Sequence, residues 1–117
     1  MLTLSETTCY YIYLYSTDMR KGFDSLSGII SSTMQLDPLS NDVYIFINRR
    51  RTQMKLLHWE GDGFGVYYKR LERGTYELPK RDENQSCIRV DIKRLEKIFQ
   101  GVSVNQNRQR KRYQHHP

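Results

Sequence analysis

Residues 43–79 constrain the fold more than any other part of the chain. Runs rich in β-branched and aromatic residues alternate there with an arginine cluster, a Gly-Asp-Gly and an Arg-Gly, and this pattern predicts an antiparallel meander. Four strands fit the pattern, at residues 43–48, 53–60, 64–70 and 75–78. Because the first has apolar side chains at both odd and even positions, we expect it to lie in the centre of the sheet.

The turns of this meander determine where its charges gather. Chain direction reverses at each turn, so the first and third turns should lie at one end of the sheet and Gly61-Asp62-Gly63 at the other. The shared end would carry many cations, with Glu72 as the acid among them. We interpret this end as a candidate functional surface, and the alternative is a solvated hairpin tip. The cations are Arg49, Arg50, Arg51, Lys69, Arg70 and Arg73, with Lys55 nearby.

An amphipathic helix is predicted before the meander, over residues 18–34. It follows a capping residue, Thr17 or Asp18, and its apolar residues recur at intervals of three and four. Arg20 and Asp24 lie one turn apart on the opposite face and are placed to form an ion pair.

Glycines mark two further features. Gly22 and Gly28 would lie inside this helix, where each costs about 1 kcal/mol relative to alanine. Either the helix is weak there or another backbone packs closely against it, and we expect close packing on the sheet. Gly61 and Gly63 are both expected to supply backbone angles that other residues avoid, as a tight hairpin turn requires.

Shorter segments complete the domain. Residues 10–15 alternate aliphatic residues with tyrosines, which predicts a strand at an edge of the sheet or paired with a neighbour. Residues 88–91 are either a short strand or the entry to a last helix over residues 91–100, for which Gly101 is the stop signal. The predicted fold class is therefore α+β: a single domain with an antiparallel meander sheet of four to six strands, one longer helix and one short helix.

Length and charge define the limits of this domain. A chain of 117 residues with 38% apolar residues supports one hydrophobic core, which we assign to residues 10–104. We expect residues 1–9 to be flexible and residues 105–117 to be a disordered basic tail, which either binds nucleic acid or only adds solubility. Four of the six net positive charges lie in that tail, at Arg108, Arg110, Lys111 and Arg112.

Several function classes find no support in the sequence. No run of eighteen apolar residues and no secretory leader are present, so we expect a cytoplasmic protein that does not enter a membrane. Cys9 and Cys87 have no partners at metal-ligand spacing, and we expect neither a metal nor another cofactor. The carboxylates show no spacing typical of a two-metal nuclease, and no nucleophile paired with a base is evident, so we expect no enzymatic activity.

Aromatic residues of the predicted strands are a separate candidate feature. Trp59, Tyr67 and Tyr68 belong to the residue types that stack on unpaired bases. Aromatic residues on strands more often belong to the core or to the sheet surface, so both interpretations stay open.

Three blocks of the chain resemble one known family: residues 17–30, TDMRKGFDSLSGII; residues 36–40, LDPLS; and residues 43–79, from VYIFINRRR to GTYELP. They are similar to the accessory protein called TnpB, or second open reading frame product, of transposons of the insertion-sequence sixty-six type, which differs from the RNA-guided nuclease of the same name. Glu60 departs from the family, which usually has aspartate there. The most specific blocks are D-M-R-K-G-F and W-x-G-D-G-F. We interpret most of their residues, together with the neighbouring Asp24, as mainly structural. These residues are Asp18, Arg20, Lys21, Gly22, Phe23, Asp24, Trp59, Gly61, Asp62 and Gly63.

The resemblance implies a role in transposition beside a separate transposase, without an established catalytic activity. Our leading hypothesis is therefore a non-catalytic accessory factor that contacts the DNA backbone through the basic sheet edge and the basic tail. The rival hypothesis is a protein-interaction module that docks on the transposase, or on another protein encoded by the same transposon, without binding DNA itself. A salt-sensitive interaction would favour the first hypothesis, and one that persists at high salt would favour the second.

Overall fold

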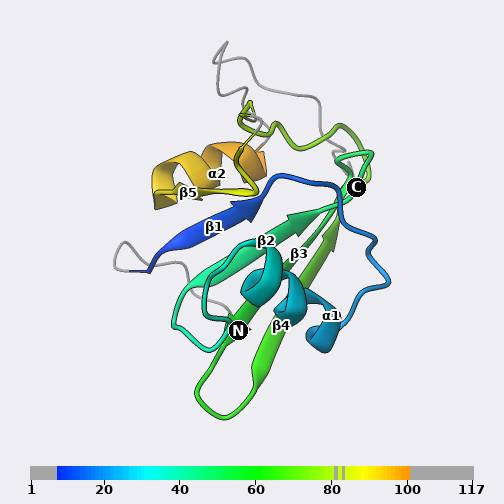
Figure 1. Cartoon of the computed structure of the whole chain (residues 1–117). Coiled ribbons are helices and arrows are strands. Elements are labelled where there is room, and N and C mark those ends of the chain that lie inside the picture. Colours follow the sequence, from blue (N-terminus) through cyan, green and yellow to red (C-terminus); the bar gives the residue numbers. More distant parts are fainter. Residues whose placement is uncertain (1–7, 81, 83, 101–117) are drawn as a thin grey trace.

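A five-stranded sheet forms the centre of the molecule. The structure is a computed structural model that describes residues 8–80, 82 and 84–100. The strands are β1 Tyr10–Tyr13, β2 Val43–Ile47, β3 Gln53–Trp59, β4 Phe64–Arg70 and β5 Cys87–Val90. They lie in the order β4-β3-β2-β1-β5, with β1 parallel to β2 and the other neighbours antiparallel (Figure 1). The described residues thus form a single α+β domain, as predicted, and its sheet is mixed but mostly antiparallel.

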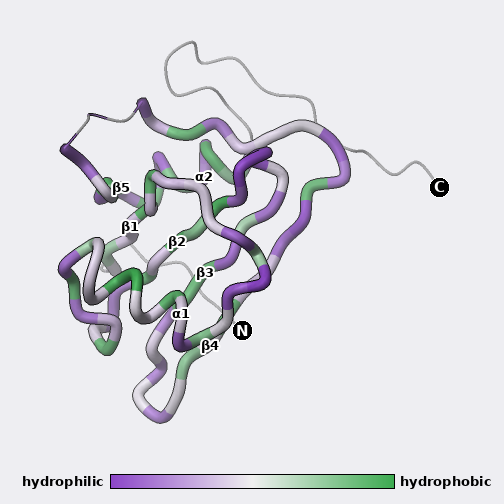
Figure 2. Tube along the Cα trace, turned by 45° about the vertical axis from the view of Figure 1, so that its right-hand side comes forward, coloured by the Kyte–Doolittle hydropathy of each residue, from purple (hydrophilic) through white to green (hydrophobic). Residues whose placement is uncertain are grey.

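Helical segments cover both faces of the sheet. On one face lie the helix α1, Phe23–Gly28, and the π-helical segment η1, Ile29–Thr33, with Leu26 in their core. On the other face lies the helix α2, Ile92–Gln100, with Leu95 in its core. Hydrophobic stretches run through the middle of the fold, and the peripheral loops are largely hydrophilic (Figure 2). The sheet therefore separates two apolar clusters, one under each helical layer.

The predicted central position of the first meander strand is confirmed. All five residues of β2 are buried, because β2 lies between β1 and β3 and both of its faces are covered. Val43, Ile45 and Ile47 belong to the core under α2, whereas Tyr44 and Phe46 belong to the core under α1. Burial on both faces explains why this strand is continuously apolar.

Three of the four predicted meander strands are present, and the fourth is wrong. Residues 75–78 form no strand, because the chain returns from β4 across the turn between β2 and β3. There the backbone N–H of Tyr76 donates to the carbonyl oxygen of Arg51 at 2.7 Å. The Tyr76 side chain is buried and meets the ring of Phe99 edge-on, with 6.4 Å between the ring centroids. The strand-like alternation in this segment therefore reflects packing of Tyr76 under α2.

The parallel pairing of β1 with β2 was not predicted from the meander pattern. A parallel pair needs a crossover connection, which here is formed by residues 14–42 and contains α1 and η1. The predicted strand at residues 10–15 is confirmed, although it ends at Tyr13. On its other side β1 pairs with β5, which resolves the two alternatives for residues 88–91 in favour of a strand.

The first helix is shorter than predicted. It begins at Phe23 rather than at residue 18, its N-cap is Gly22, and no side chain caps it. The carboxylate of Asp18 instead accepts hydrogen bonds from the backbone N–H of Arg20, at 2.9 Å, and from the Arg20 guanidinium. The predicted pairing of Arg20 with Asp24 is therefore wrong. A carboxylate that bonds the backbone two residues ahead offers the chain a turn in place of a helix start.

The predicted close packing of a backbone against Gly22 and Gly28 is also wrong. A Cβ added to either glycine would meet no atom within 4 Å. Gly28 lies where the helix widens from α to π geometry, and its carbonyl oxygen accepts a hydrogen bond from the Ser32 hydroxyl at 2.5 Å. In the β3–β4 hairpin, Gly61 has a φ of 93°, but Gly63 does not have a positive φ, so one glycine and not two supplies the left-handed angle.

The predicted last helix is confirmed as α2, which begins one residue later than expected. Asp91 caps it, since its carboxylate accepts a hydrogen bond from the backbone N–H of Arg94 at 2.8 Å. The predictions for the N-terminal segment up to residue 7, for Gly101 and for the basic tail fall outside the described residues. None of the helices within the described ranges has the length and apolar composition needed to cross a lipid bilayer.

Candidate nucleic-acid interface

One end of the sheet collects three loops that are distant in sequence. β1, β2 and β4 end there and β3 begins there, as their pairing directions require. The loop after β1 is tied to this end by the N–H of Thr17, which donates to the Ile47 carbonyl oxygen at 2.9 Å. The segment after β4 is tied to it by the N–H of Leu71, which donates to the Thr52 carbonyl oxygen at 2.7 Å. The expected shared end of the first and third turns is thus confirmed for the backbone, although the fourth strand is absent.

Asn48 organises the turn between β2 and β3, residues 48–52, which we call the arginine turn. Its side-chain oxygen accepts hydrogen bonds from the backbone N–H groups of Thr52 and Gln53, each at 2.9 Å. Its carbonyl oxygen accepts a hydrogen bond from the N–H of Arg51 at 3.0 Å, and Arg51 has a φ of 60°. Sequence reasoning missed Asn48, although asparagine is a common first residue of tight turns. The result is a compact loop from which Arg49, Arg50 and Arg51 are exposed.

Most of the predicted cations at this end carry no ion pair to a residue that the structure describes. Among the described residues, no acidic side chain forms an ion pair with the three arginines of the turn, with Lys69 or with Arg73. Arg70 differs, because its guanidinium lies 3.0 Å from the Glu72 carboxylate, whose hydrogen bond raises the pKa of Arg70. We call the five cations without an ion pair the arginine end: Arg49, Arg50, Arg51, Lys69 and Arg73.

Lys55 does not join the arginine end. Its Nζ donates to the carbonyl oxygen of Lys21 at 2.9 Å and lies 5.4 Å from the centre of the Tyr68 ring. Lys55 is half-buried, and it links β3, β4 and the segment before α1. Sequence position alone grouped it with the other cations, but its contacts are those of a packing residue.

The two family-specific blocks meet through aromatic rings. Phe23, in the first block, stacks on Phe64 with 6.3 Å between centroids, and Trp59, in the second, meets Phe64 edge-on at 5.0 Å. Phe64 directly follows the Gly61-Asp62-Gly63 turn. The blocks therefore fasten the start of α1 to the β3–β4 hairpin. Asp24 is exposed in the first turn of α1.

Asp18 and Arg20 form an exposed ion pair beside the arginine turn. The shortest contact joins the Arg20 guanidinium to the carboxylate at 2.6 Å. The hydrogen bonds from the Arg20 side chain lower the pKa of Asp18 to about 2, from an ordinary value of 3.8. The pair thus adds no net charge to this end of the sheet at neutral pH.

Two surface grooves flank the arginine turn. The first has a volume of about 580 Å³ and lies between the β1–α1 loop, the arginine turn and the neighbouring ends of β3 and β4. The second, of about 470 Å³, lies between the same loop, Arg51 and residues 78–80. Ser16 lines both grooves. The first is lined by, among others, Thr17, Asp18, Arg20, Arg49, Arg50, Gln53 and Tyr68.

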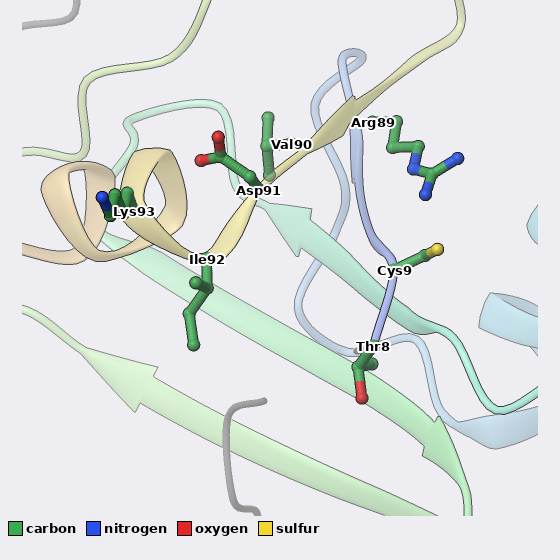
Figure 3. Close-up of a pocket in the computed structure, with 7 residues that line it drawn as sticks. All are labelled: Thr8, Cys9, Arg89, Val90, Asp91, Ile92 and Lys93. Atoms are coloured by element: carbon green, nitrogen blue, oxygen red, sulfur yellow. The ribbon is translucent and has the colours of Figure 1, made fainter. Parts of the chain in front are cut away.

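A further depression, of about 550 Å³, lies near the start of β1, the end of β5 and the start of α2. Its side chains do not converge on a common point: Cys9 and Arg89 point to one side, and Lys93 projects from the helix on the other (Figure 3). The Asp91 carboxylate is engaged in capping α2. We therefore find no constellation for catalysis or ligand binding here.

Metal-ligating and nucleophilic groups are scattered over the described ranges. There, no group of three or more His, Cys, Asp and Glu side chains lies close enough to hold a metal ion. Cys9 and Cys87 are free thiols and are partly rather than fully buried, and burial raises the pKa of Cys87. The tail cations Arg108, Arg110, Lys111 and Arg112 lie outside the described residues.

Comparison with known proteins points to one family. The uncharacterized protein y4hO of Sinorhizobium fredii (strain NBRC 101917 / NGR234) is 28% identical over 102 residues, which are 87% of this chain and 87% of that protein. The uncharacterized protein y4jC of the same strain is 29% identical over 62 residues, or 53% of each chain. No solved structure matches the chain. The family model described as IS66 Orf2 like protein matches residues 8–109, and the chain therefore belongs to this family.

Proposed function

We propose that the protein is a non-catalytic accessory factor of DNA transposition that contacts the DNA backbone through its arginine end. Membership of the IS66 Orf2-like family suggests the accessory role, and that family is one of accessory proteins rather than known enzymes. The direct contact with DNA is our own proposal. Its partners would be DNA, either transposon ends or any sequence, together with the transposase and other proteins of the same transposon.

A single observation carries the DNA contact: five cations from two distant segments lie at one end of the sheet without an ion pair to described residues. Exposed cations that are not neutralised by neighbouring acids attract phosphates and release counterions when they bind. The arginine turn is also held in one conformation by Asn48. A fixed loop loses less conformational freedom on binding than a mobile one, which supports backbone contact by these side chains.

The experiment that tests this proposal removes the charge of the turn. For the variant Arg49→Ala/Arg50→Ala/Arg51→Ala, we expect weaker binding to duplex transposon-end DNA in a filter-binding assay. If each arginine contacts one phosphate, the slope of log affinity against log salt becomes shallower by about 2.7, since each phosphate contact contributes about 0.9. A matched control, Arg89→Ala/Lys93→Ala/Lys97→Ala, removes the same charge from exposed residues of β5 and α2. Equal affinities and slopes for the two variants would refute the proposal.

A second function is favoured by the edge strand β4. Within the described residues β4 pairs only with β3, and Val66 and Tyr67 on this strand are exposed. An extended peptide of the transposase would add to such an edge by strand pairing. In this case the complex with the transposase would persist at high salt, and retention on heparin would be weak. Our leading proposal predicts instead that heparin retains the protein and that salt releases it steeply.

A further inference from the structure

The arginine turn lies between two open surface grooves. Arg49 and Arg50 border the first groove, Arg51 borders the second, and Ser16 belongs to both. The two volumes, of about 580 and 470 Å³, are large enough for a small organic group, and both grooves are open to solvent. The cations are therefore placed between two spaces that each have room for a base.

Each groove also has a tyrosine with an exposed ring. Tyr68 lines the first groove with 52% of its surface exposed, and Tyr15 lines the second with 42% exposed. Large exposed aromatic rings beside cations are the usual platform for unpaired bases, because every base offers a face on which a ring can stack. Tyr68 lies on the exposed surface of β4, as its strand-surface interpretation predicts, and there it lines a groove next to Arg49 and Arg50.

The ring of Tyr68 is fixed before any ligand arrives. Its hydroxyl is hydrogen-bonded to the side-chain oxygen of Gln53, and the ammonium of Lys55 lies over the ring. Lys55 is itself held by the carbonyl oxygen of Lys21. A ring immobilised in this way loses little rotamer freedom when a base stacks on it, which increases the net gain from stacking.

We propose that the two grooves and the arginine turn together hold a single, unpaired nucleic-acid strand, with phosphates over the arginines and bases stacked on Tyr68 and Tyr15. In a duplex the bases are stacked on one another, so the grooves would stay empty and only the arginines would touch the backbone. In an unpaired strand the bases are free to enter the grooves. This inference rests on the proposed function, because both use the same arginines.

The test measures fluorescence anisotropy of labelled oligonucleotides of about 12 nucleotides, a length within the usual site size of single-strand binding folds. Three probes of one sequence are compared: single-stranded DNA, single-stranded RNA and duplex DNA. The variants Tyr68→Ala and Tyr15→Ala are each expected to weaken single-strand binding about tenfold, since stacking of one base contributes about that much. Neither variant removes a charge, so the salt slope is expected to stay unchanged.

Tyr67→Ala is the matched control. Tyr67 neighbours Tyr68 on β4, is 48% exposed, and pairs in register with Leu56, whose side chain belongs to the core under α2. It therefore lies on the face of the sheet opposite to Tyr68, and we expect its removal to change affinity by less than about twofold. Tyr68→Phe keeps the ring but loses the hydrogen bond to Gln53, so its single-strand affinity should lie between those of the parent chain and of Tyr68→Ala if stacking is the cause. Circular dichroism of each variant checks that the fold is retained.

The outcomes separate this inference from the function on which it rests. Equal or tighter binding of the duplex by the parent chain, or equal effects of Tyr68→Ala and Tyr67→Ala on the single strand, would overturn the inference. In that case a loss of duplex affinity in the arginine variant would still support the proposed function. If the arginine variant binds all three probes as tightly as its matched control does, both proposals fail.

Discussion

At the scale of single residues, Asn48 determines whether the arginines are presented at all. It holds the arginine turn through hydrogen bonds to the backbone of Thr52 and Gln53 and to the Thr52 hydroxyl. We expect Asn48→Ala to lower the free energy of unfolding by about 1–3 kcal/mol, because two backbone donors lose their partner. Urea unfolding measures this, and DNA affinity should fall although no charge is removed.

The control for this prediction is Asn41→Ala, at an exposed asparagine in the loop before β2. A surface substitution of this kind changes the free energy of unfolding by no more than about 0.5 kcal/mol. Equal losses of stability in the two variants would show that the hydrogen bonds of Asn48 do not organise the turn.

Asp18 and Arg20 provide a prediction about pH. The pKa of Asp18 is lowered to about 2 in the folded chain, below its ordinary value of 3.8, mainly by the hydrogen bonds from the Arg20 side chain. A carboxyl whose folded pKa is depressed stabilises the fold above its unfolded pKa, and this contribution disappears as the pH falls through the folded value. We expect an NMR titration of the Asp18 carboxyl to give a midpoint near 2.

Replacement of the guanidinium tests the cause of this shift. In Arg20→Gln the Asp18 midpoint should rise towards 3.8, the ordinary value for aspartate. Arg20→Lys keeps the charge but loses the two-pronged geometry, so it should give an intermediate midpoint. If neither substitution moves the midpoint, the Arg20 side chain is not what lowers the pKa.

At the scale of elements, the β3–β4 hairpin separates the roles of its two glycines. Gly61 has a φ of 93°, which strains any residue with a Cβ, whereas Gly63 has no such angle. We expect Gly61→Ala to reduce the free energy of unfolding by about 1 kcal/mol or more, and Gly63→Ala to leave it almost unchanged. Thermal unfolding compares the two variants directly. Equal losses would mean that the turn requires both glycines for reasons other than backbone angle.

The elements also show where sequence reasoning succeeds and where it fails. β2 and α2 were predicted because burial on two faces and helical spacing of apolar residues leave a direct trace in the sequence. The predicted start of α1 is wrong because the Asp18 carboxylate accepts a hydrogen bond from the backbone N–H of Arg20 and forms a turn there. In the sequence, an aspartate in this turn cannot be told apart from one that caps a helix. Residues 75–78 have a strand pattern, yet the N–H of Tyr76 donates a hydrogen bond to the Arg51 carbonyl oxygen. This N–H is therefore not available for pairing with a neighbouring strand.

Only part of the candidate site can be predicted from the sequence. The gathering of the arginine turn with Lys69 and Arg73 follows from strand direction alone, which a pattern of strands and turns can supply. The diversion of Lys55 to the Lys21 carbonyl oxygen, and the place of Tyr68 in a groove, depend on the loop between β1 and α1. That loop meets β2 and β3 because β1 is parallel to β2, and no local signal in the sequence specifies this pairing.

At the scale of the whole molecule, the arginine end and the tail are two separate clusters of cations. We expect a chain that ends at residue 104 to bind duplex DNA more weakly, because it lacks Arg108, Arg110, Lys111 and Arg112. If each contacts one phosphate, the salt slope becomes shallower by about 3.6. Filter binding across a salt series measures both quantities. A truncated chain with the affinity of the full chain would mean that the tail only adds solubility.

The open side of β4 has one further consequence, which concerns colloidal behaviour. A strand with an unpaired side invites other copies of the chain to add to it, and natural proteins discourage this with charged residues on such strands. β4 ends in Lys69 and Arg70, whose charges keep neighbouring copies apart, and Lys69 is also one of the cations that we propose contact phosphates. Loss of these cations would therefore carry a risk of fibrillar assembly, which restricts the sequences open to this protein.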